Sequence, residues 1–302
     1  MDIALLEGLT IGAPATYNGV TVFPVTGGTK VPDGLQIGSE GVTVSELESA
    51  EVPTLLVTNT TDQPVLLLEG EVLEGGQQTR TLNVSVLVPA NSSVEVPVSC
   101  VEAGRWGGER GFRRSNYMTS REVRTRKLVG VQRNLRLMPG YKASDQGAVW
   151  GAVSDSLERH QTSSPTSSFE EVRAAAYERD DARREATDRL IATGPEAGQT
   201  GVVVAVDGKV VSAELFGSPE LLAARWEQIV RSVMFESGFQ DAGSVTAADA
   251  EAFLRRLATA EVQPAAGVGI GEERHLQNED LVAQALVLDD ALVHASVFSR
   301  SF

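Results

Sequence analysis

The sequence predicts an α+β protein with an antiparallel β-rich N-terminal half, sandwich or barrel-like, followed by helices packed on a small β-sheet. Over roughly the first hundred residues, short apolar segments are separated by Gly, Pro, Asn and Asp, at a spacing typical of antiparallel sandwiches and barrels. Beyond residue 150, helical periodicity and hairpin patterns alternate. We therefore expect residues 1–150 to form a β-rich half that carries the main motif and residues 151–302 an α+β half, the two making one integrated domain.

In the N-terminal half, residues 81–88 alternate well enough to have one buried face, with Leu82, Val84, Val86 and Val88 on the same side. Segment 106–147 differs from it, because this segment is rich in Gly and Arg and shows little periodicity. We therefore expect loop and irregular structure there.

Two helices are expected next. A short one covers about 148–159, and a longer one runs from Ser168 to about Ala192. Ser168 with Glu171 three residues later has the pattern of a capping box, which supports the start of the second helix.

The C-terminal part contains the clearest hairpin pattern. Two apolar segments, 202–206 and 210–216, are joined by Asp207-Gly208, a pair typical of tight hairpin turns. The remaining expected elements are a helix that begins at Ser218-Pro219, a helix from Thr246, and a closing hairpin of 281–288 and 291–298.

Composition restricts the class of protein. The chain has 302 residues and a formal net charge of -15, so we do not expect general binding to nucleic acid, whose phosphates would be repelled. Its single cysteine is typical of a reducing compartment. We expect no signal peptide, because Asp2 and Glu7 replace a basic leader, and no membrane span, because no apolar segment approaches about 20 residues. A cytoplasmic location is therefore expected.

The first candidate catalytic residues are two glutamates. Glu69 and Glu71 lie two positions apart in a strand-like segment, which would put both carboxylates on one face, roughly 7 Å apart. Carboxylates at such a distance can differ in pKa and perform acid-base chemistry. The alternative is a solvated strand face beside a turn.

A second candidate feature is a polar turn. Gly75 and Gly76 allow backbone conformations in which successive N–H groups converge on an anion. Gln77 adds amide donors and Arg80 adds a guanidinium, so the turn could bind a phosphate, a carboxylate or a ribose hydroxyl. An ordinary hairpin turn with exposed polar residues is the alternative.

The sequence gives less support to catalysis by cysteine or to metal binding. Cys100 and the nearby Glu102 end a strand-like segment, and no histidine motif accompanies them, so we expect a buried, inert thiol. The three histidines, His160, His275 and His294, lack metal-binding spacing, and we expect neither a metal nor a cofactor.

Arg105 and Trp106 open a basic segment, residues 105–136, in which ten Lys and Arg accompany two acidic residues. An arginine beside an aromatic residue can hold a planar or anionic group. Three interpretations stay open for the segment: internal pairing with the acidic remainder of the chain, a small anionic ligand, and nucleic acid.

The sequence GGQQTRT at 75–81, followed by VPANSSVEVPVSCVEAGRW at 88–106, resembles the ARG and Rhodanese-Phosphatase-superfamily-associated Protein domain family, in which ARG stands for ADP-ribosylglycohydrolase. Residues 202–226 and the strand around His294 are also similar to it, so the resemblance spans about 5–297. The family name implies a role near NAD or ADP-ribose chemistry and assigns no reaction to any residue.

We therefore expect a cytoplasmic accessory protein that binds a phosphate-bearing nucleotide-type ligand related to ADP-ribose or NAD. The expected ligand-binding residues are Gly75, Gly76, Gln77, Arg80, Arg105 and Trp106. If turnover occurs, the candidate bases are Glu69, Glu71 and Glu102. The alternative is a non-catalytic interaction scaffold that docks an acidic partner protein or RNA through the basic segment 105–136.

Overall fold

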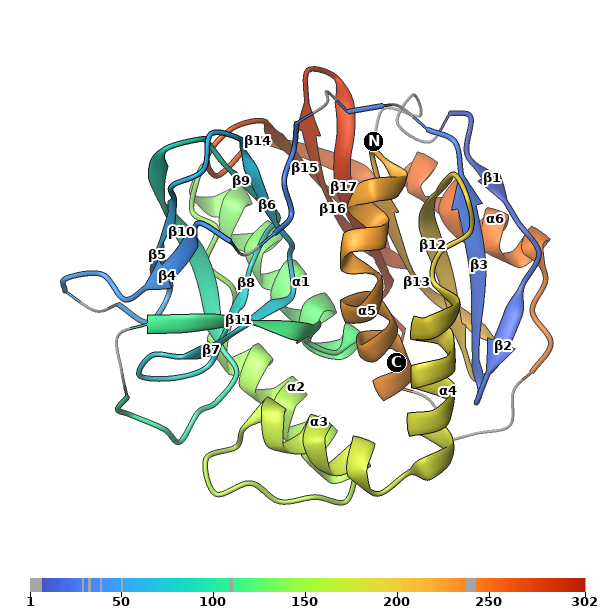
Figure 1. The fold of residues 1–302 in the computed structure, drawn as a ribbon, viewed down its shortest axis with the longest axis horizontal. Helices are drawn as coiled ribbons and strands as arrows, with labels where there is room; N and C mark the ends of the chain where they lie inside the picture. Colours follow the sequence, from blue (N-terminus) through green and yellow to red (C-terminus); the bar gives the residue numbers. More distant parts are fainter. Residues whose placement is uncertain are drawn as a thin grey trace. The chain divides into compact units, whose positions relative to one another are not determined.

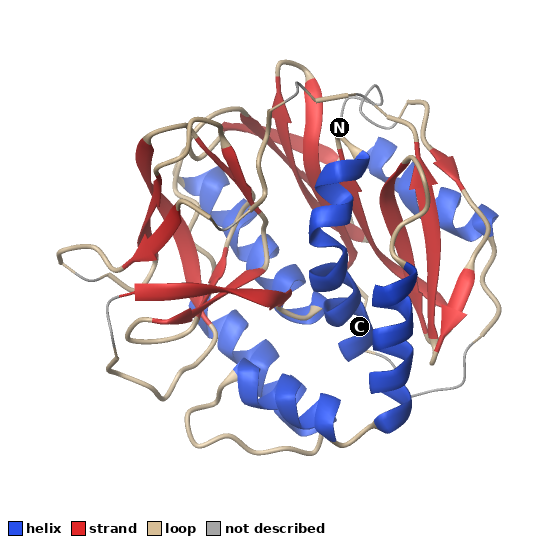
Figure 2. Cartoon of the chain, viewed as in Figure 1, coloured by secondary structure: helices blue, strands red, loops and turns tan. Residues whose placement is uncertain are grey.

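The computed structural model describes residues 7–28, 30–31, 34–38, 40–49, 51–108, 111–236 and 243–301. Strands and helices mix throughout this part of the chain (Figure 2), and the α+β class expected from the sequence is confirmed. The fold divides into two compact units. The barrel unit comprises 34–180 and 266–270, and the sheet unit comprises 1–33, 181–265 and 271–302.

The barrel unit is built on a closed barrel in the strand order β10-β5-β4-β11-β7-β8, drawn in blue to teal in Figure 1. Its strands are β4 (Val42–Ser45), β5 (Thr54–Asn59), β7 (Glu71–Gly75), β8 (Arg80–Leu82), β10 (Ser92–Cys100) and β11 (Gly111–Met118). A separate two-stranded sheet joins β6 (Val65–Leu67) to β9 (Val86–Val88). Every barrel pair is antiparallel, which agrees with the predicted β-rich start.

The strand register defines the interior of the barrel. Val96 of β10 lies opposite Leu55 of β5, and Val57 of β5 lies opposite Val44 of β4. All four side chains are buried, whereas their neighbours along β5 and β10 are partly exposed. Since side chains alternate between the two faces of a strand, the face of these residues is the interior one. The same parity along β10 places Cys100 inside the barrel.

Three helices belong to the barrel unit: α1 (Arg121–Leu137), α2 (Gln146–Arg159) and α3 (Phe169–Glu178). Helix α2 packs against β10 and α1 packs against α2. The prediction of irregular structure over 106–147 is wrong for 111–118 and 121–137, which form β11 and α1. Helix α1 buries Arg124, Lys127 and other polar residues beside Leu128, Val131 and Leu135, so the apolar periodicity of its buried face is weak in the sequence.

The sheet unit contains a nine-stranded sheet in the described residues, in the order β1-β3-β12-β13-β17-β16-β15-β14, with β2 paired to β3. Its strands are β1 (Thr10–Ile11), β2 (Ala15–Tyr17), β3 (Val20–Thr26), β12 (Gln199–Val206), β13 (Lys209–Phe216), β14 (Glu261–Ala266), β15 (Glu272–Gln277), β16 (Leu281–Leu288) and β17 (Ala291–Ser299). Both predicted hairpins are confirmed. Asp207 and Gly208 adopt positive φ angles of 49° and 77°, as the tight turn between β12 and β13 requires.

The helices of the sheet unit are α4 (Asp181–Thr193), α5 (Pro219–Phe235) and α6 (Ala247–Arg255), and the 3₁₀ helix η2 (Arg256–Thr259) follows α6. The side chains of Ser218 and Thr246 cap α5 and α6, as predicted. The helix expected from Ser168 to about Ala192 is instead two helices, α3 and α4, and Ser168 makes no side-chain cap bond. Helices α5 and α6 lie on opposite faces of the sheet (Figure 1), and Phe253 of α6 belongs to the main apolar core.

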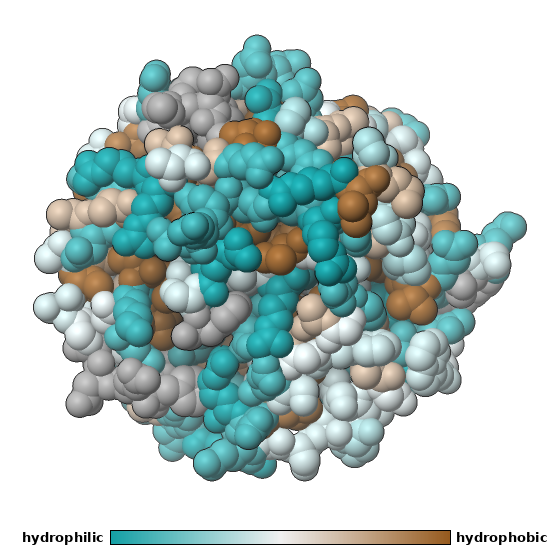
Figure 3. Space-filling model, turned by 180° about the vertical axis from the view of Figure 1, so that it is seen from behind, coloured by the Kyte–Doolittle hydropathy of each residue, from teal (hydrophilic) through white to brown (hydrophobic). Residues whose placement is uncertain are grey.

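No helix in the described part of the chain is long and apolar enough to cross a lipid bilayer. On the face shown in Figure 3, hydrophobic residues form small patches separated by hydrophilic ones. Patches of that kind are ordinary for a protein surface.

Candidate functional site

One arginine joins the turn that follows β7 to the loop that follows β10. We call these two segments, residues 75–79 and 103–108, the barrel end. Arg105 Nη2 donates a hydrogen bond to the carbonyl oxygen of Gly75 at 3.0 Å, and its Nη1 donates to that of Gly76 at 2.9 Å. The Arg105 guanidinium therefore holds the turn and the loop together.

Glu102 is the carboxylate partner of this arginine. Its Oε2 accepts from Arg105 Nε at 2.8 Å and from the Oγ1 and N–H of Thr79 at 2.8 and 3.1 Å. Its Oε1 accepts from Thr166 Oγ1 at 3.2 Å. Burial acts to raise the pKa of Glu102, but the hydrogen bonds from Arg105 and Thr79 outweigh it, and the pKa is lowered. A carboxylate stabilised in this way is a weak general base.

The two glycines of the turn are required by its backbone and its packing. Gly75 has a φ of 118° and Gly76 a φ of 55°, in the region that side chains disfavour. A Cβ atom on Gly76 would overlap the ring of Phe112, with Cε1 at 2.5 Å. The glycines therefore let Phe112 pack directly on the turn, and the Gly76 N–H donates to the carbonyl of Gly111 at 3.0 Å.

Two residues of the barrel end present side chains to solvent. Gln77 is exposed, while its backbone N–H donates to Glu46 Oε1 at 3.1 Å and its carbonyl accepts from the Gly107 N–H at 3.3 Å. Trp106 is 68% exposed, which is unusual for so large an apolar side chain. The barrel end thus exposes an amide and an indole on a backbone that is itself hydrogen-bonded.

Arg80 points into the barrel. It lies directly opposite Leu73 of β7 and Cys100 of β10, so the three side chains share the interior face. Arg80 is 2% exposed, and its Nε donates to the carbonyl of Val52 at 3.3 Å. Within the described chain, its Nη1 has no hydrogen-bond partner. Burial lowers the pKa of Arg80, and nearby Cys100 and Glu46 oppose that shift.

Glu46 and Gln78 share this property with Arg80, and we call the three residues the interior polar cluster. Gln78 is 0% exposed, and neither Oε1 nor Nε2 of its amide has a partner among the described residues. Glu46 is 6% exposed, and its Oε2 also has no hydrogen-bond partner among the described residues. A buried polar atom without a hydrogen bond destabilises a fold by about 1–3 kcal/mol. A cluster of such atoms is therefore a candidate for contact with water, an ion or a ligand.

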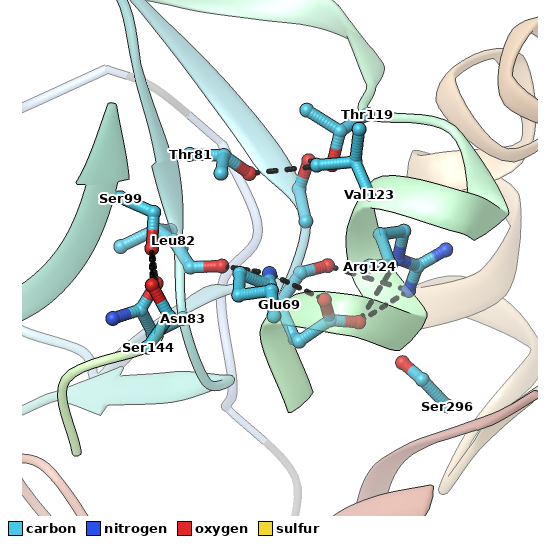
Figure 4. A network of polar contacts seen from close by, with 12 residues as sticks. Glu69, Thr81, Leu82, Asn83, Ser99, Thr119, Val123, Arg124, Ser144 and Ser296 are labelled. Carbon is cyan, nitrogen blue, oxygen red and sulfur yellow. Dashed lines mark hydrogen bonds and ion pairs between the residues drawn. The ribbon is translucent and has the colours of Figure 1, made fainter. Parts of the chain in front are cut away.

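Glu69 belongs to a different set of contacts (Figure 4). Its Oε2 accepts from Nη2 and Nε of Arg124 at 2.7 and 2.9 Å, and its Oε1 forms an ion pair with Lys127 Nζ at 2.5 Å. Burial acts to raise the pKa of Glu69, but Arg124 and Lys127 outweigh it and lower the pKa to about 2. The Glu69 carboxylate therefore joins the loop before β7 to helix α1.

Glu71 is paired with Arg114 of β11. Arg114 Nη2 donates to Glu71 Oε2 at 3.0 Å, Arg114 Nε contacts Glu71 Oε1, and both side chains are buried. Gly70, between the two glutamates, has a φ of 83°, and a Cβ atom there would lie 2.5 Å from Arg124 Nε. Each glutamate thus has its own cation, and the two carboxylates form no acid-base pair with each other.

The basic segment 105–136 pairs extensively within the barrel unit. Seven of its described Lys and Arg side chains form ion pairs with acidic residues of that unit: Arg105, Arg113, Arg114, Arg124, Arg126, Lys127 and Arg133. Internal pairing is therefore the interpretation that the contacts favour. The segment's charge offsets the acidic residues beside it.

The sheet unit contains buried histidines that sequence reasoning did not connect to acids. His275 Nε2 lies 2.7 Å from Glu273 Oε2, and His294 Nε2 lies 3.0 Å from Glu214 Oε2, which also accepts from Ser296 Oγ at 3.1 Å. The i,i+2 spacing of Glu273 and His275 on one strand was the available signal. Among the described residues, no group of three or more His, Cys, Asp or Glu side chains could hold a metal ion.

The structure therefore brings most of the predicted ligand-binding residues to one barrel end and gives them different contacts. Arg105 holds the backbone of Gly75 and Gly76, whereas Gln77 and Trp106 face solvent and Arg80 lies inside. Two residues of the interior polar cluster, Glu46 and Gln78, were not predicted. Chemically, this end combines an exposed aromatic surface with buried groups that donate and accept hydrogen bonds.

Comparison with known proteins identifies a family over nearly the whole chain. Residues 8–298 match the family model described as ARPP-1, the ARG and Rhodanese-Phosphatase-superfamily-associated Protein domain. The function of this domain is unassigned. No curated protein and no solved structure matches the chain.

Proposed function

Since the chain belongs to the ARG and Rhodanese-Phosphatase-superfamily-associated Protein domain family, we propose that it binds a phosphate-bearing nucleotide-type ligand related to ADP-ribose or NAD. The proposed site is the barrel end, residues 75–79 and 103–108, with the interior polar cluster behind it. The role is that of a cytoplasmic accessory protein, as the sequence led us to expect.

The buried guanidinium of Arg80 is the observation that supports this proposal most. A buried donor without a hydrogen-bond partner destabilises a fold by about 1–3 kcal/mol. Glu69, Glu71 and Glu102 each have a cation within hydrogen-bond distance, whereas Arg80 Nη1 has no partner among the described residues. A ligand that accepts a hydrogen bond from Nη1 would remove this penalty.

The exposed side chains of the barrel end suit the remainder of a nucleotide. Trp106 offers a large aromatic surface, and stacking of a base on such a surface contributes about 1–3 kcal/mol. Gln77 offers an amide that both donates and accepts hydrogen bonds. Arg105 acts here by holding the turn and loop in place, because its donors already reach the carbonyls of Gly75 and Gly76.

Isothermal titration calorimetry with ADP-ribose, NAD and inorganic phosphate tests the proposal. We expect ADP-ribose or NAD to bind with a Kd below about 1 mM, which corresponds to roughly -4 kcal/mol. The Arg80→Met variant should lose this binding. Arg113→Met is the matched control, because Arg113 lies on the exposed surface and pairs with Glu74. Absence of nucleotide binding, or unchanged binding by Arg80→Met, would refute the proposal.

The contacts give less support to the scaffold hypothesis. Docking of an acidic partner or RNA through segment 105–136 needs cations that are available to the partner. Arg124 and Lys127 are buried on Glu69, and Arg114 is buried on Glu71. Releasing these pairs would leave buried charges without partners, which is strongly destabilising.

A further inference from the structure

We propose that the part of the ligand that enters the barrel is an uncharged planar group with a hydrogen-bond donor beside an acceptor, as in a carboxamide or the edge of a nucleobase. The phosphates of the ligand would remain outside the barrel. This inference rests on the proposed nucleotide-binding function and deepens it, because it assigns a chemical class to the group that meets Glu46, Gln78 and Arg80.

The charges of the interior polar cluster argue against a buried phosphate. Arg80 carries one positive charge, and the Gln77 N–H donates to Glu46 Oε1 at 3.1 Å, so the Glu46 carboxylate lies beside the segment that carries Gln78 and Arg80. The two charges offset each other, so a phosphate placed against Arg80 would also meet the Glu46 carboxylate. Repulsion between like charges grows as the dielectric constant falls inside a protein. A neutral group avoids that repulsion.

The atoms without partners in the described chain are complementary to a donor–acceptor edge. Arg80 Nη1 is a donor, Glu46 Oε2 is an acceptor, and Gln78 offers one of each through Nε2 and Oε1. An anion could accept only from Arg80 and Gln78, and would leave Glu46 Oε2 unsatisfied. A cation would leave Arg80 Nη1 unsatisfied. A group that accepts and donates side by side, such as a carboxamide, can satisfy both residues.

The surrounding side chains favour a planar, largely apolar body. Leu73 and Cys100 flank Arg80 on the interior face, and both are 0% exposed. Phe112 lies opposite Val44 and Gly75 in the register, so its ring also belongs to this face. Aromatic rings stack favourably on other planar groups. A small ring with a polar edge therefore matches both the walls and the polar atoms.

Access to the cluster passes through the barrel end. Arg80 is 2% exposed, so a ligand group can reach it only when the turn and the loop separate. The hydrogen bonds that must then break include those from Arg105 to Gly75 and Gly76, at 3.0 and 2.9 Å. The gain from satisfying the buried atoms offsets this loss.

Matched ligand pairs test the inference. Calorimetry on the full chain would compare benzamide with benzoate, two molecules of similar shape that differ in charge. It would also compare ADP-ribose and NAD with ribose 5-phosphate, which has a phosphate but neither a base nor a carboxamide. We expect benzamide to bind at least ten-fold more tightly than benzoate, and ribose 5-phosphate to bind at least ten-fold more weakly than either dinucleotide-type ligand.

The same set of ligands shows whether the group that enters the barrel is the base or the carboxamide. Comparable affinities for ADP-ribose and NAD would assign the polar edge to the base, which then would not stack on Trp106. Tighter binding of NAD would assign it to the carboxamide and leave the adenine free to stack on Trp106. Either result supports the inference. Equal binding of ribose 5-phosphate and ADP-ribose, or of benzoate and benzamide, would overturn it.

The variant Glu46→Gln tests the role assigned to the acidic side chain. It removes the negative charge while retaining the shape, so the preference for benzamide over benzoate should fall at least ten-fold. Gln78→Met is the second variant, and it should weaken benzamide binding without reversing the preference. Thermal unfolding confirms that each variant is folded. If Glu46→Gln prefers benzamide over benzoate as strongly as the wild type does, and the wild type still binds ADP-ribose or NAD, only this inference is refuted. If the wild type binds neither ADP-ribose nor NAD, the proposed function is refuted.

Discussion

Arg80 lies directly opposite Cys100 in the pairing of β8 with β10, and its side chain shares the interior face of the barrel with that thiol. Arg105, only five positions after Cys100, has its guanidinium on the carbonyls of Gly75 and Gly76 instead. The two arginines of the predicted site therefore have opposite roles. Arg105 maintains the backbone of the barrel end, and Arg80 keeps an unsatisfied donor behind it.

Replacing Arg105 with Met should destabilise the fold. The change removes its hydrogen bonds to two carbonyls and the charge partner of Glu102, and we expect the free energy of unfolding to fall by about 2–4 kcal/mol. Urea denaturation measures this loss, and amide hydrogen exchange should accelerate in residues 75–79. Arg113→Met, at an exposed ion pair, should change stability by less than about 1 kcal/mol. Equal effects of the two variants would contradict the assigned role of Arg105.

Gly76→Ala should also destabilise the barrel unit, through strain rather than charge. The added Cβ would overlap the Phe112 ring, and the φ of 55° disfavours any side chain. We expect a loss of at least about 2 kcal/mol in unfolding free energy. Gly111→Ala is the control, because a Cβ there meets nothing within 4 Å. A Gly76→Ala variant as stable as Gly111→Ala would show that the turn does not need glycine.

Glu69→Gln should be strongly destabilising. It leaves the buried cations Arg124 and Lys127 without their shared carboxylate, and breaking a buried ion pair in this way lowers stability by about 3–5 kcal/mol. Denaturant titration at neutral pH measures the effect. A loss below about 1 kcal/mol would show that the three side chains contribute little to holding α1.

The same carboxylate makes stability depend on acid pH. The pKa of Glu69 is about 2 in the folded protein, below its reference value of 4.5. Its stabilising contribution is therefore complete above pH 4.5 and is lost as the pH falls from there toward 2. A difference of this size corresponds to about 3 kcal/mol. Unfolding free energies measured across this range should fall more steeply for the wild type than for Glu69→Gln, and parallel curves would contradict the assignment.

Trp106→Ala separates ligand binding from folding. The side chain is 68% exposed, so its removal should change the unfolding free energy by less than about 0.5 kcal/mol. If a base stacks on the indole, affinity for ADP-ribose or NAD should fall at least about five-fold. Calorimetry and thermal unfolding of the same sample measure both. Unchanged affinity would place the base elsewhere.

Local sequence signals correctly predicted the hairpins of the sheet unit and the starts of α5 and α6. The β12–β13 turn at Asp207-Gly208 depends on backbone preferences of those two residues, and the starts of α5 and α6 depend on the capping side chains of Ser218 and Thr246. Each of these signals acts over three or four residues. Sequence inspection can therefore detect them without knowledge of the tertiary structure.

Features set by distant contacts were not predictable in the same way. Helix α1 places Arg124 and Lys127 on its buried side because Glu69, more than fifty residues earlier, receives them. Arg80 and Arg105 look equivalent in the sequence, and only the strand register turns Arg80 inward. Glu46 joins the site from the position directly after β4, without a motif that links it to Gln77. Those contacts arise from tertiary structure, which local patterns do not encode.

The most direct test of the account compares the thermal unfolding of the wild type and Arg80→Met, each with and without a saturating concentration of ADP-ribose. Without ligand, we expect Arg80→Met to unfold at the same or a higher temperature, because Met removes Arg80 Nη1, a buried donor without a hydrogen-bond partner among the described residues. With ligand, only the wild type should gain stability. An Arg80→Met protein that unfolds at a lower temperature without ligand, or that gains as much from ADP-ribose as the wild type, would contradict the claim that Arg80 is retained for ligand binding.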